Sequence, residues 1–336
     1  MFFHTRAQAI FATELASTNR PLFRPRCQET VLTKTSFLLF RGAGRLAVTG
    51  SIVSMAWACT AQTDISFFVL VKSSNYAQDA SGNLTLLNHH FFSEIFLTEG
   101  GHIESAALTL PNRPLESMEY EDRDSNFYLE GGHFDTLEEL DVAYPNGTFF
   151  FDIEAPSVKI TEESLRLADP RDETILPDPI TITLYQSGQT VSPEEIAADQ
   201  ALVIRWSEFA GGAVDPRGIV DDMIFVVVAN CHGERLYHTG LPFQGTYLTF
   251  RTPEVSVPAN TLMSGQPYSM FVEFPSVVDS RVIRGVPGFT SYATATYLDL
   301  HTVGPTWDAG CPEAPPPMDT GQTDRMEPLA GDSVIR

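Results

Sequence analysis

Basic residues are scarce in this chain, and their shortage excludes one class of partner. The 336 residues include 21 Lys and Arg against 43 Asp and Glu, which gives a formal net charge of −22 at pH 7. The first 61 residues are basic, whereas the rest has 14 bases against 41 acids. Such a body repels nucleic-acid phosphates and anionic lipid headgroups. We therefore expect no nucleic-acid partner, and we interpret the charge mainly as a source of solubility.

Long apolar runs are also missing. A membrane-spanning helix needs ~20 apolar residues, and the uncharged stretch 46–58 is too short to be one. Three basic residues precede this stretch, and the small residues Ala56 and Ala58 close it. This order is typical of a secretory signal peptide. We predict an exported protein (periplasmic, cell-surface or secreted) without a transmembrane span, and we assign residues 1–61 to a signal peptide with an over-extended N-terminus.

Cysteine is rare, with four in the whole chain. Cys59 directly follows Ala58, and a lipoprotein signal also places its lipid-modified cysteine after a small residue. Bulky Trp57 at the second position is unusual for such a signal. Free secretion is therefore the favoured interpretation, and a lipid anchor at Cys59 is the alternative.

Catalytic and metal-binding motifs are absent from the sequence. No Gly-x-Ser-x-Gly elbow marks a serine nucleophile, and adjacent residues of a strand, such as His89 and His90, point to opposite faces. The spacing of His232 and His238 matches no zinc pattern, and the acidic segment 119–124 lacks the glycine of a calcium loop, although weak calcium binding stays open there. We expect that the protein binds no metal and no cofactor and is not an enzyme. The alternative is that it is a secreted hydrolase or an accessory domain of a carbohydrate-active system.

Short β patterns are what the sequence has in abundance. Apolar and polar residues alternate between turn signals in two groups, 63–168 and 178–304, separated by a Pro-rich linker. The patterns predict an all-β fold of two β-sandwich domains in tandem. Short helices lie in the connections, one of them opened by the capping box 136–139. Residues 111–126 are expected to form a loop, and 305–336 a disordered Pro-rich tail.

Two motifs in residues 178–304 resemble the fibronectin type III family. Trp206 matches the tryptophan of the family's second strand, and Leu262, Gly265 and Tyr268 match its corner before the sixth strand. The resemblance implies an immunoglobulin-like sandwich in which the Tyr268 hydroxyl bonds to upstream backbone. It also implies that the third and seventh strands are parallel, with one strand between them. Such a fold implies binding or spacing but no particular ligand. The segment 63–168 resembles no family.

The same resemblance brings two cysteines to one end of the domain. Cys231 ends the predicted third strand, and Cys311 follows the seventh. In an oxidising compartment two such cysteines form a bridge. We predict a Cys231–Cys311 disulfide, with two free thiols as the alternative.

The resemblance also predicts the location of a binding surface. It gathers the segments 210–222 and 275–291, expected to be long loops, at the end facing the preceding domain, and binding sites favour loops and inter-domain clefts. The expected ligand is a protein or a glycan; the alternative is that the charges there only pair with one another. The residues of this surface are Asp215, Arg217, Asp221, Asp222, Arg281 and Arg284.

Overall fold

The computed structural model describes residues 63–305, apart from 112, 114, 115, 124, 125, 169, 170 and 172. Within these residues there are 17 strands and one short helix, so the predicted all-β fold is confirmed. The predicted signal peptide, Cys59, Cys311 and nearly all of the Pro-rich tail lie outside the described residues. The short α1 (Leu137–Ala143) begins at the predicted capping box, in which Thr136 and Glu139 exchange hydrogen bonds.

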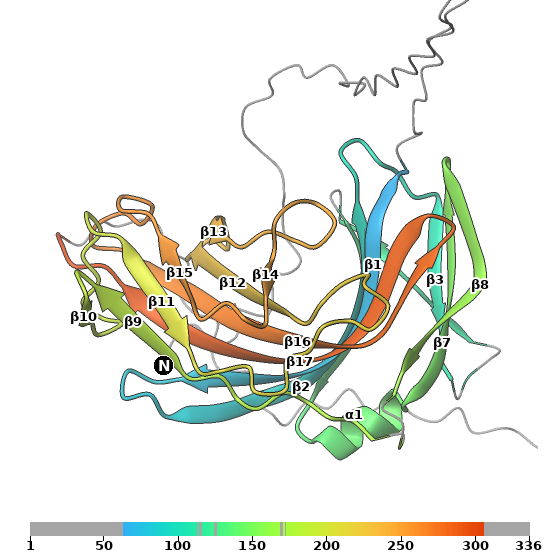
Figure 1. The fold of residues 1–336 in the computed structure, drawn as a ribbon, viewed down its shortest axis with the longest axis horizontal. Helices are drawn as coiled ribbons and strands as arrows, with labels where there is room; N and C mark the ends of the chain where they lie inside the picture. The colour runs from blue at the N-terminus through green and yellow to red at the C-terminus, as the bar shows by residue number, and fades with distance from the viewer. Residues whose placement is uncertain are drawn as a thin grey trace, which may run out of the picture. The chain divides into compact units, whose positions relative to one another are not determined.

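A nine-stranded sheet runs through the described part of the chain (Figure 1). Its order is β13-β12-β16-β17-β1-β2-β6-β5, and β14 pairs with β12 outside this path. The strands are β1 (Ile65–Gln78), β2 (Leu84–Leu97), β5 (Glu121–Asp122), β6 (Asn126–Phe134), β12 (Met223–Asn230), β13 (Arg235–His238), β14 (Leu248–Thr249), β16 (Pro267–Ile283) and β17 (Val286–His301).

The centre of this sheet joins the two predicted sandwiches. Strands β1 and β17 belong to the two different predicted domains, yet they pair in parallel from Phe68↔Gly288 to Ala77↔Tyr297. Residues 63–305 thus share one sheet and lie within one compact unit. The physical reason is that periodicity reports which face of a strand is buried, whereas it carries no information on which distant strand lies beside it.

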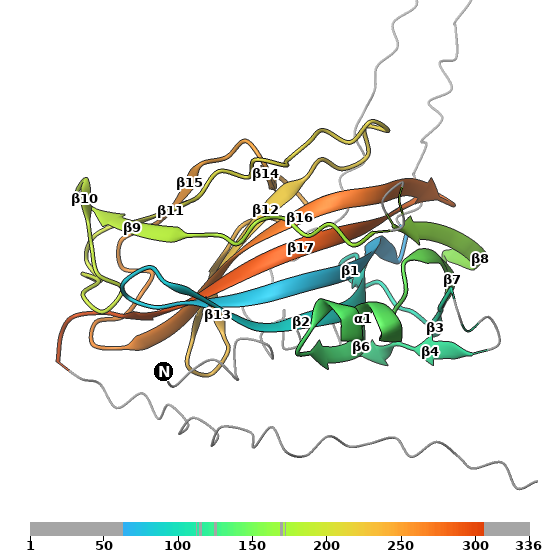
Figure 2. The ribbon, with the colours of Figure 1, turned by 90° about the horizontal axis from the view of Figure 1, so that it is seen from below.

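Two four-stranded sheets pack on the nine-stranded sheet, one over each half (Figures 1 and 2). Side chains of alternate residues in β17 and its neighbours face both of them, so the two small sheets cover the same face. The first has the order β4-β3-β7-β8, and the second β10-β9-β11-β15. Their strands are β3 (Ser105–Thr109), β4 (Ser117–Glu119), β7 (Gly147–Ala155), β8 (Val158–Leu167), β9 (Ile182–Gln186), β10 (Gln189–Thr190), β11 (Leu202–Trp206) and β15 (Glu254–Val257).

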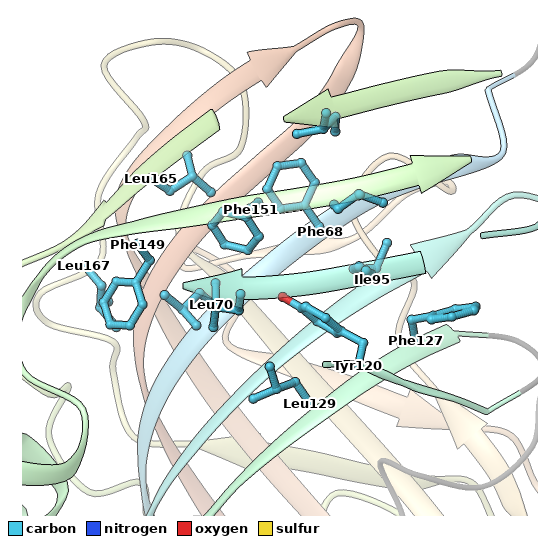
Figure 3. Close-up of a cluster of buried hydrophobic side chains, with 14 of the residues drawn as sticks. Phe68, Leu70, Ile95, Tyr120, Phe127, Leu129, Phe149, Phe151, Leu165 and Leu167 are labelled. Atoms are coloured by element: carbon cyan, nitrogen blue, oxygen red, sulfur yellow. The ribbon is translucent and has the colours of Figure 1, made fainter. Parts of the chain in front are cut away.

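Each small sheet closes a hydrophobic core of its own. The first core is aromatic: the Phe68 and Phe151 rings have centroids 4.8 Å apart, and both side chains are fully buried (Figure 3). The second core lies between β9, β11 and β15 on one side and β12, β16 and β17 on the other. The prediction that residues 111–126 form a loop is wrong in part, because β4 and β5 lie within this segment. Strand β4 pairs with β3 at the edge of the first small sheet, and β5 pairs with β6 at the edge of the nine-stranded sheet.

A polar seam separates the two cores, and the connection 173–182 runs along it. The Thr294 hydroxyl donates to the Pro177 carbonyl at 2.6 Å, and the Gln78 side chain bonds both the N–H and the C=O of Ile182 at 2.7 Å. Buried polar side chains are stable only with such partners. The described part of the predicted linker is therefore hydrogen-bonded to the shared sheet at Glu173 and Pro177.

Residues 178–304 have the sandwich topology that the resemblance implies. The Tyr268 hydroxyl accepts from the Met263 N–H at 2.6 Å and donates to the Met263 carbonyl, so the predicted tyrosine corner is confirmed. The third and seventh strands, β12 and β17, flank β16 in parallel, as expected. Trp206 is half-buried at the edge of the second core, where its indole N–H donates to the Thr252 carbonyl at 3.0 Å.

The prediction that residues 275–291 form a long loop is wrong. Strands β16 and β17 continue through it and meet in a tight turn at Arg284 and Gly285, whose φ angles are 55° and 89°. Two consecutive positive φ angles are typical of a two-residue hairpin. The strands extend because Ile283 and Val286, at their ends, are buried in the first core. By contrast, the segment 210–222 is a loop without regular strand, as predicted.

Candidate functional site

A pocket of about 470 Å³ opens where β8, the connection after it, the loop before β12 and β16 meet. Three arginines line it: Arg166 on β8, Arg217 in the loop and Arg281 on β16. Asp279 and Tyr292 also line it. The remaining lining residues are Ala168, Ile175, Ser276, Val277 and Val278. The pocket therefore has a small-molecule size and a largely apolar wall with a few charged groups.

Asp279 fixes the position of this arginine cluster. Its side chain is only 5% exposed, and one carboxylate oxygen accepts from the Arg217 guanidinium at 2.5 Å. The other oxygen accepts from the Arg166 backbone N–H at 2.9 Å and lies 3.5 Å from the Arg281 Nε. One buried carboxylate thus ties together β8, the loop and β16. The Arg217 and Arg281 side chains remain about half exposed, at 52% and 48%, so both can reach a molecule in the pocket.

Alternation along β16 explains part of this placement. Asp279 and Arg281 lie two residues apart, so both project from the same face of the strand. Thr290 on β17 supports the position of β8 beside them, since its hydroxyl donates to the Arg166 carbonyl at 2.7 Å and accepts from the Asp279 N–H. The arginine cluster is therefore built on paired strands, which hold a site more precisely than a free loop does.

Asp215, one of the predicted binding residues, organises the loop. It is buried, and its carboxylate accepts from the backbone N–H groups of Arg217, Ile219 and Val220 and from the Ser280 hydroxyl at 2.7 Å. Burial opposes ionisation, but these hydrogen bonds prevail and lower the pKa of Asp215. Its lone pairs are directed at the protein's own backbone.

Asp222 has a similar role at the end of the loop. Its carboxylate accepts from the Val277 and Ala213 N–H groups at 2.7 and 2.9 Å, and burial raises its pKa against the effect of these bonds. Asp221 accepts from the Asp215 N–H at 3.0 Å, so it too stabilises the loop. These acidic residues hold Arg217 in place.

The structure separates the two predicted arginines of β16 and its turn. Arg281 lines the pocket, whereas Arg284 lies in the hairpin turn, with its Nε 3.8 Å from a carboxylate oxygen of Glu163. Of the six predicted residues, Arg217 and Arg281 are thus brought together. Sequence reasoning missed Arg166, because a residue of β8 carries no local signal of its distance to the loop or to β16.

The electrostatics of the pocket differ from those of the chain as a whole. Three arginines and one aspartate line the pocket, whereas the chain has a net charge of −22. Arginine presents a planar array of N–H donors that matches carboxylate and sulfate or phosphate oxygens. The pocket is therefore suited to an anionic group.

Cys231, at the far end of β12, is disulfide-bonded. The three other cysteines, Cys27, Cys59 and Cys311, lie outside the described residues. The pairing of Cys231 with Cys311 thus stays a prediction. Within residues 63–305, no helix is long and apolar enough to cross a membrane.

Comparisons with known proteins do not extend this picture. The sequence matches no protein-family model and no curated protein. Among solved structures, one match is a biofilm-associated protein BSP domain, with 11% sequence identity and a TM-score of 0.18. The alignment covers 70% of this chain but only 30% of that structure. The FN1–FN3 domains of chicken CNTN1 are 8% identical, with coverage of 72% of this chain and 67% of that one and a TM-score of 0.20. Likeness at this level carries no argument about function.

Proposed function

We propose that this protein is an exported, non-enzymatic binding module whose ligand is an acidic saccharide. The observation that carries the proposal is the cluster of Arg166, Arg217 and Arg281 around a pocket of about 470 Å³. A carboxylate or sulfate of the ligand would accept from the half-exposed guanidinium groups of Arg217 and Arg281, while the apolar wall would contact the sugar ring.

The size of the pocket favours a saccharide over a protein surface. Protein interfaces bury about 800 Å² per partner, whereas small-molecule sites are concave pockets of about 300–1,000 Å³. A concave site of this volume accommodates one or two sugar rings. The remaining acidic surface repels other polyanions, which restricts anionic ligands to this place.

Two independent features support export. One is the order of basic, apolar and small residues before position 59, which is typical of a signal peptide. The other is the disulfide at Cys231, because disulfides persist in oxidising compartments and are rare in the cytosol of most organisms.

The carboxylate chemistry of the pocket supports binding rather than hydrolysis. Glycoside hydrolysis uses a pair of carboxyl groups, one of them a general acid. Among the described residues that line the pocket, Asp279 is the sole carboxylate, and both of its oxygens accept hydrogen bonds from the protein. Asp279 therefore serves to hold the arginines.

A glycan array with a matched pair of variants tests the proposal. Arg281→Gln removes a guanidinium from the pocket, and Arg284→Gln makes the same change of charge three residues away, outside the pocket. A charge-assisted hydrogen bond contributes about 1.5–3 kcal/mol, so the Arg281 variant should bind acidic glycans about 10- to 150-fold more weakly. The Arg284 variant should bind like the wild type.

Two results would contradict the proposal. One is retention of acidic glycans no better than their neutral counterparts. The other is equal binding by the Arg281 and Arg284 variants, which would assign the arginines to structural ion pairs. The melting temperature of each variant serves as the control, since exposed pairs contribute only ~0–1 kcal/mol.

A further inference from the structure

A second cluster of functional side chains lies on the opposite face of the nine-stranded sheet. It consists of His90 on β2 and of Glu130 and His133 on β6. One ligand atom from each of them lies within 4.8 Å of the others. The His90 Nε2 lies 2.7 Å from the Glu130 Oε1, and the His133 Nδ1 lies 4.0 Å from the same oxygen.

A β-bulge brings the two residues of β6 to one face. Residues three apart in a regular strand point to opposite faces, but His90 pairs with His133 while Phe92 pairs with Glu130. Two steps along β2 thus match three along β6, which is the count of a bulge. The extra residue turns Glu130 and His133 to the same side as His90.

Two glycines make this bulge possible. Gly132 has a φ of +94°, a conformation that L side chains rarely adopt. A Cβ on Gly131 would lie 2.3 Å from the Phe91 ring, so only glycine fits there. The Glu130 carboxylate also accepts from the Gly132 N–H at 2.9 Å, which orients it toward the histidines. The backbone conformation at these two glycines therefore positions the side chains of the cluster.

We propose that His90, Glu130 and His133 form a binding site for a divalent transition-metal ion of the Zn²⁺ class. Two imidazole nitrogens and one carboxylate suit zinc and similar ions, whereas calcium and magnesium require mostly oxygen ligands. The proposal is independent of the arginine pocket, because no residue is shared between the two sites.

Small movements would complete the coordination. Zinc bonds of about 2.0–2.2 Å place tetrahedral ligand atoms about 3.3–3.5 Å apart. The 4.0 Å pair of His133 and Glu130 must therefore close by about 0.6 Å, and the 2.7 Å pair of His90 and Glu130 must open by about as much. The Glu130 and His133 side chains are 41% and 32% exposed and can rotate, whereas His90 is 11% exposed and fixed. In the metal-free protein the His90 Nε2–H donates to Glu130, and binding moves this proton to Nδ1 or to solvent.

The open side of the site faces solvent. Behind His90 and His133 there is a space of only about 10 Å³, lined also by Glu273 and Tyr297, which holds at most one water molecule. A fourth ligand must therefore come from the exposed side, where Glu130 and His133 lie. Three protein ligands with one open position leave room for water or for a donor group of another molecule.

Titration calorimetry of the tag-free full-length chain with ZnCl₂ tests this site. We expect one ion per chain and a loss of at least about tenfold in affinity in His133→Gln and Glu130→Gln, since even partners of metal ligands contribute 10–100-fold. His102→Gln is the matched control, because His102 is an exposed histidine outside the cluster. Absence of saturable binding, or equal binding by His133→Gln and the wild type, would overturn the proposal.

Cobalt absorption provides a second readout that does not depend on affinity alone. Co²⁺ in a four-coordinate site with histidine ligands absorbs in the visible range, and this absorption should disappear in His133→Gln. Circular dichroism of the metal-free variants should match the wild type, which separates loss of the site from loss of the fold. A cobalt spectrum that survives in both Glu130→Gln and His133→Gln would place the metal elsewhere and overturn the assignment.

Discussion

Glu273 gives a prediction that links the buried polar groups of the sheet to stability. It lies on β16 opposite Phe225 and Ala295, and its side chain is buried. Burial raises the pKa of Glu273 from 4.5 to about 8, and the charge of the nearby Glu94 contributes to the rise. Glu273 is therefore protonated in the folded protein at neutral pH, whereas it is ionised in the unfolded chain.

The sign of the effect follows from this difference. A pKa that is higher in the folded state means that folding binds a proton above pH 4.5, so stability is full below that pH and is lost as pH rises toward 8. With one pKa unit equal to about 1.4 kcal/mol, the rise from 4.5 to about 8 implies a loss of about 4 kcal/mol between pH 5 and pH 9. Glu273→Gln keeps the shape of the neutral side chain and removes this loss.

Urea unfolding at pH 5, 7 and 9, in buffer with a chelator, measures the effect. The Glu273→Gln variant should resemble the wild type at pH 5 and exceed it by several kcal/mol at pH 9. Glu195→Gln, which changes an exposed glutamate, is the control for the change of charge. A difference between wild type and Glu273→Gln that stays constant across these pH values would refute the reasoning, because it would show no proton uptake by Glu273.

Three further predictions concern the tyrosine corner, the buried pair of Lys72 on β1 and Asp141 on α1, and the disulfide. Tyr268→Phe should lower the free energy of unfolding by about 1–2 kcal/mol, because backbone groups five residues upstream lose their partner; urea titration measures this. Asp141→Ala should cost about 3 kcal/mol or more, since it leaves the fully buried Lys72 without its 2.6 Å partner, whereas Lys72→Met should cost less because Asp141 is 34% exposed; equal costs would contradict this. A Cys231–Cys311 bridge closes a loop of about 80 residues, worth about 4–5 kcal/mol, and labelling of thiols in unreduced, denatured protein should spare both positions; labelling of Cys311 would exclude this pairing.

The sequence predicts local features of the fold well. Alternating residues and turn signals identify most strands, and the capping box at Thr136 and the corner at Tyr268 are confirmed in atomic detail. Each of these features depends on residues within about five positions of one another. The predicted strand topology of residues 178–304 is confirmed as well, because two local motifs were sufficient to indicate it.

Features that depend on distant pairing could not be predicted. The parallel pairing of β1 with β17 joins residues more than 200 positions apart, and it lengthens the β16–β17 hairpin through what was expected to be a loop. The same limit applies to the sites. Gly131-Gly132 in a strand is a signal of a bulge, but the sequence does not indicate that His90 lies beside it. Likewise, Arg166 meets Arg217 and Arg281 only in the folded protein.

The most direct test of the central claim is a double-mutant cycle between Arg281 and one carboxylate of the ligand. The acidic glycan that binds best on the array is compared with its methyl ester, which removes the charge while it keeps the sugar. For the wild type, the ester should bind about tenfold or more weakly; for Arg281→Gln, this preference for the acid should shrink, because one of the two half-exposed guanidinium groups is gone while Arg217 remains. An ester that binds the wild type as tightly as the acid, or a preference for the acid that is as large in Arg281→Gln as in the wild type, would contradict recognition of an anionic group by this pocket.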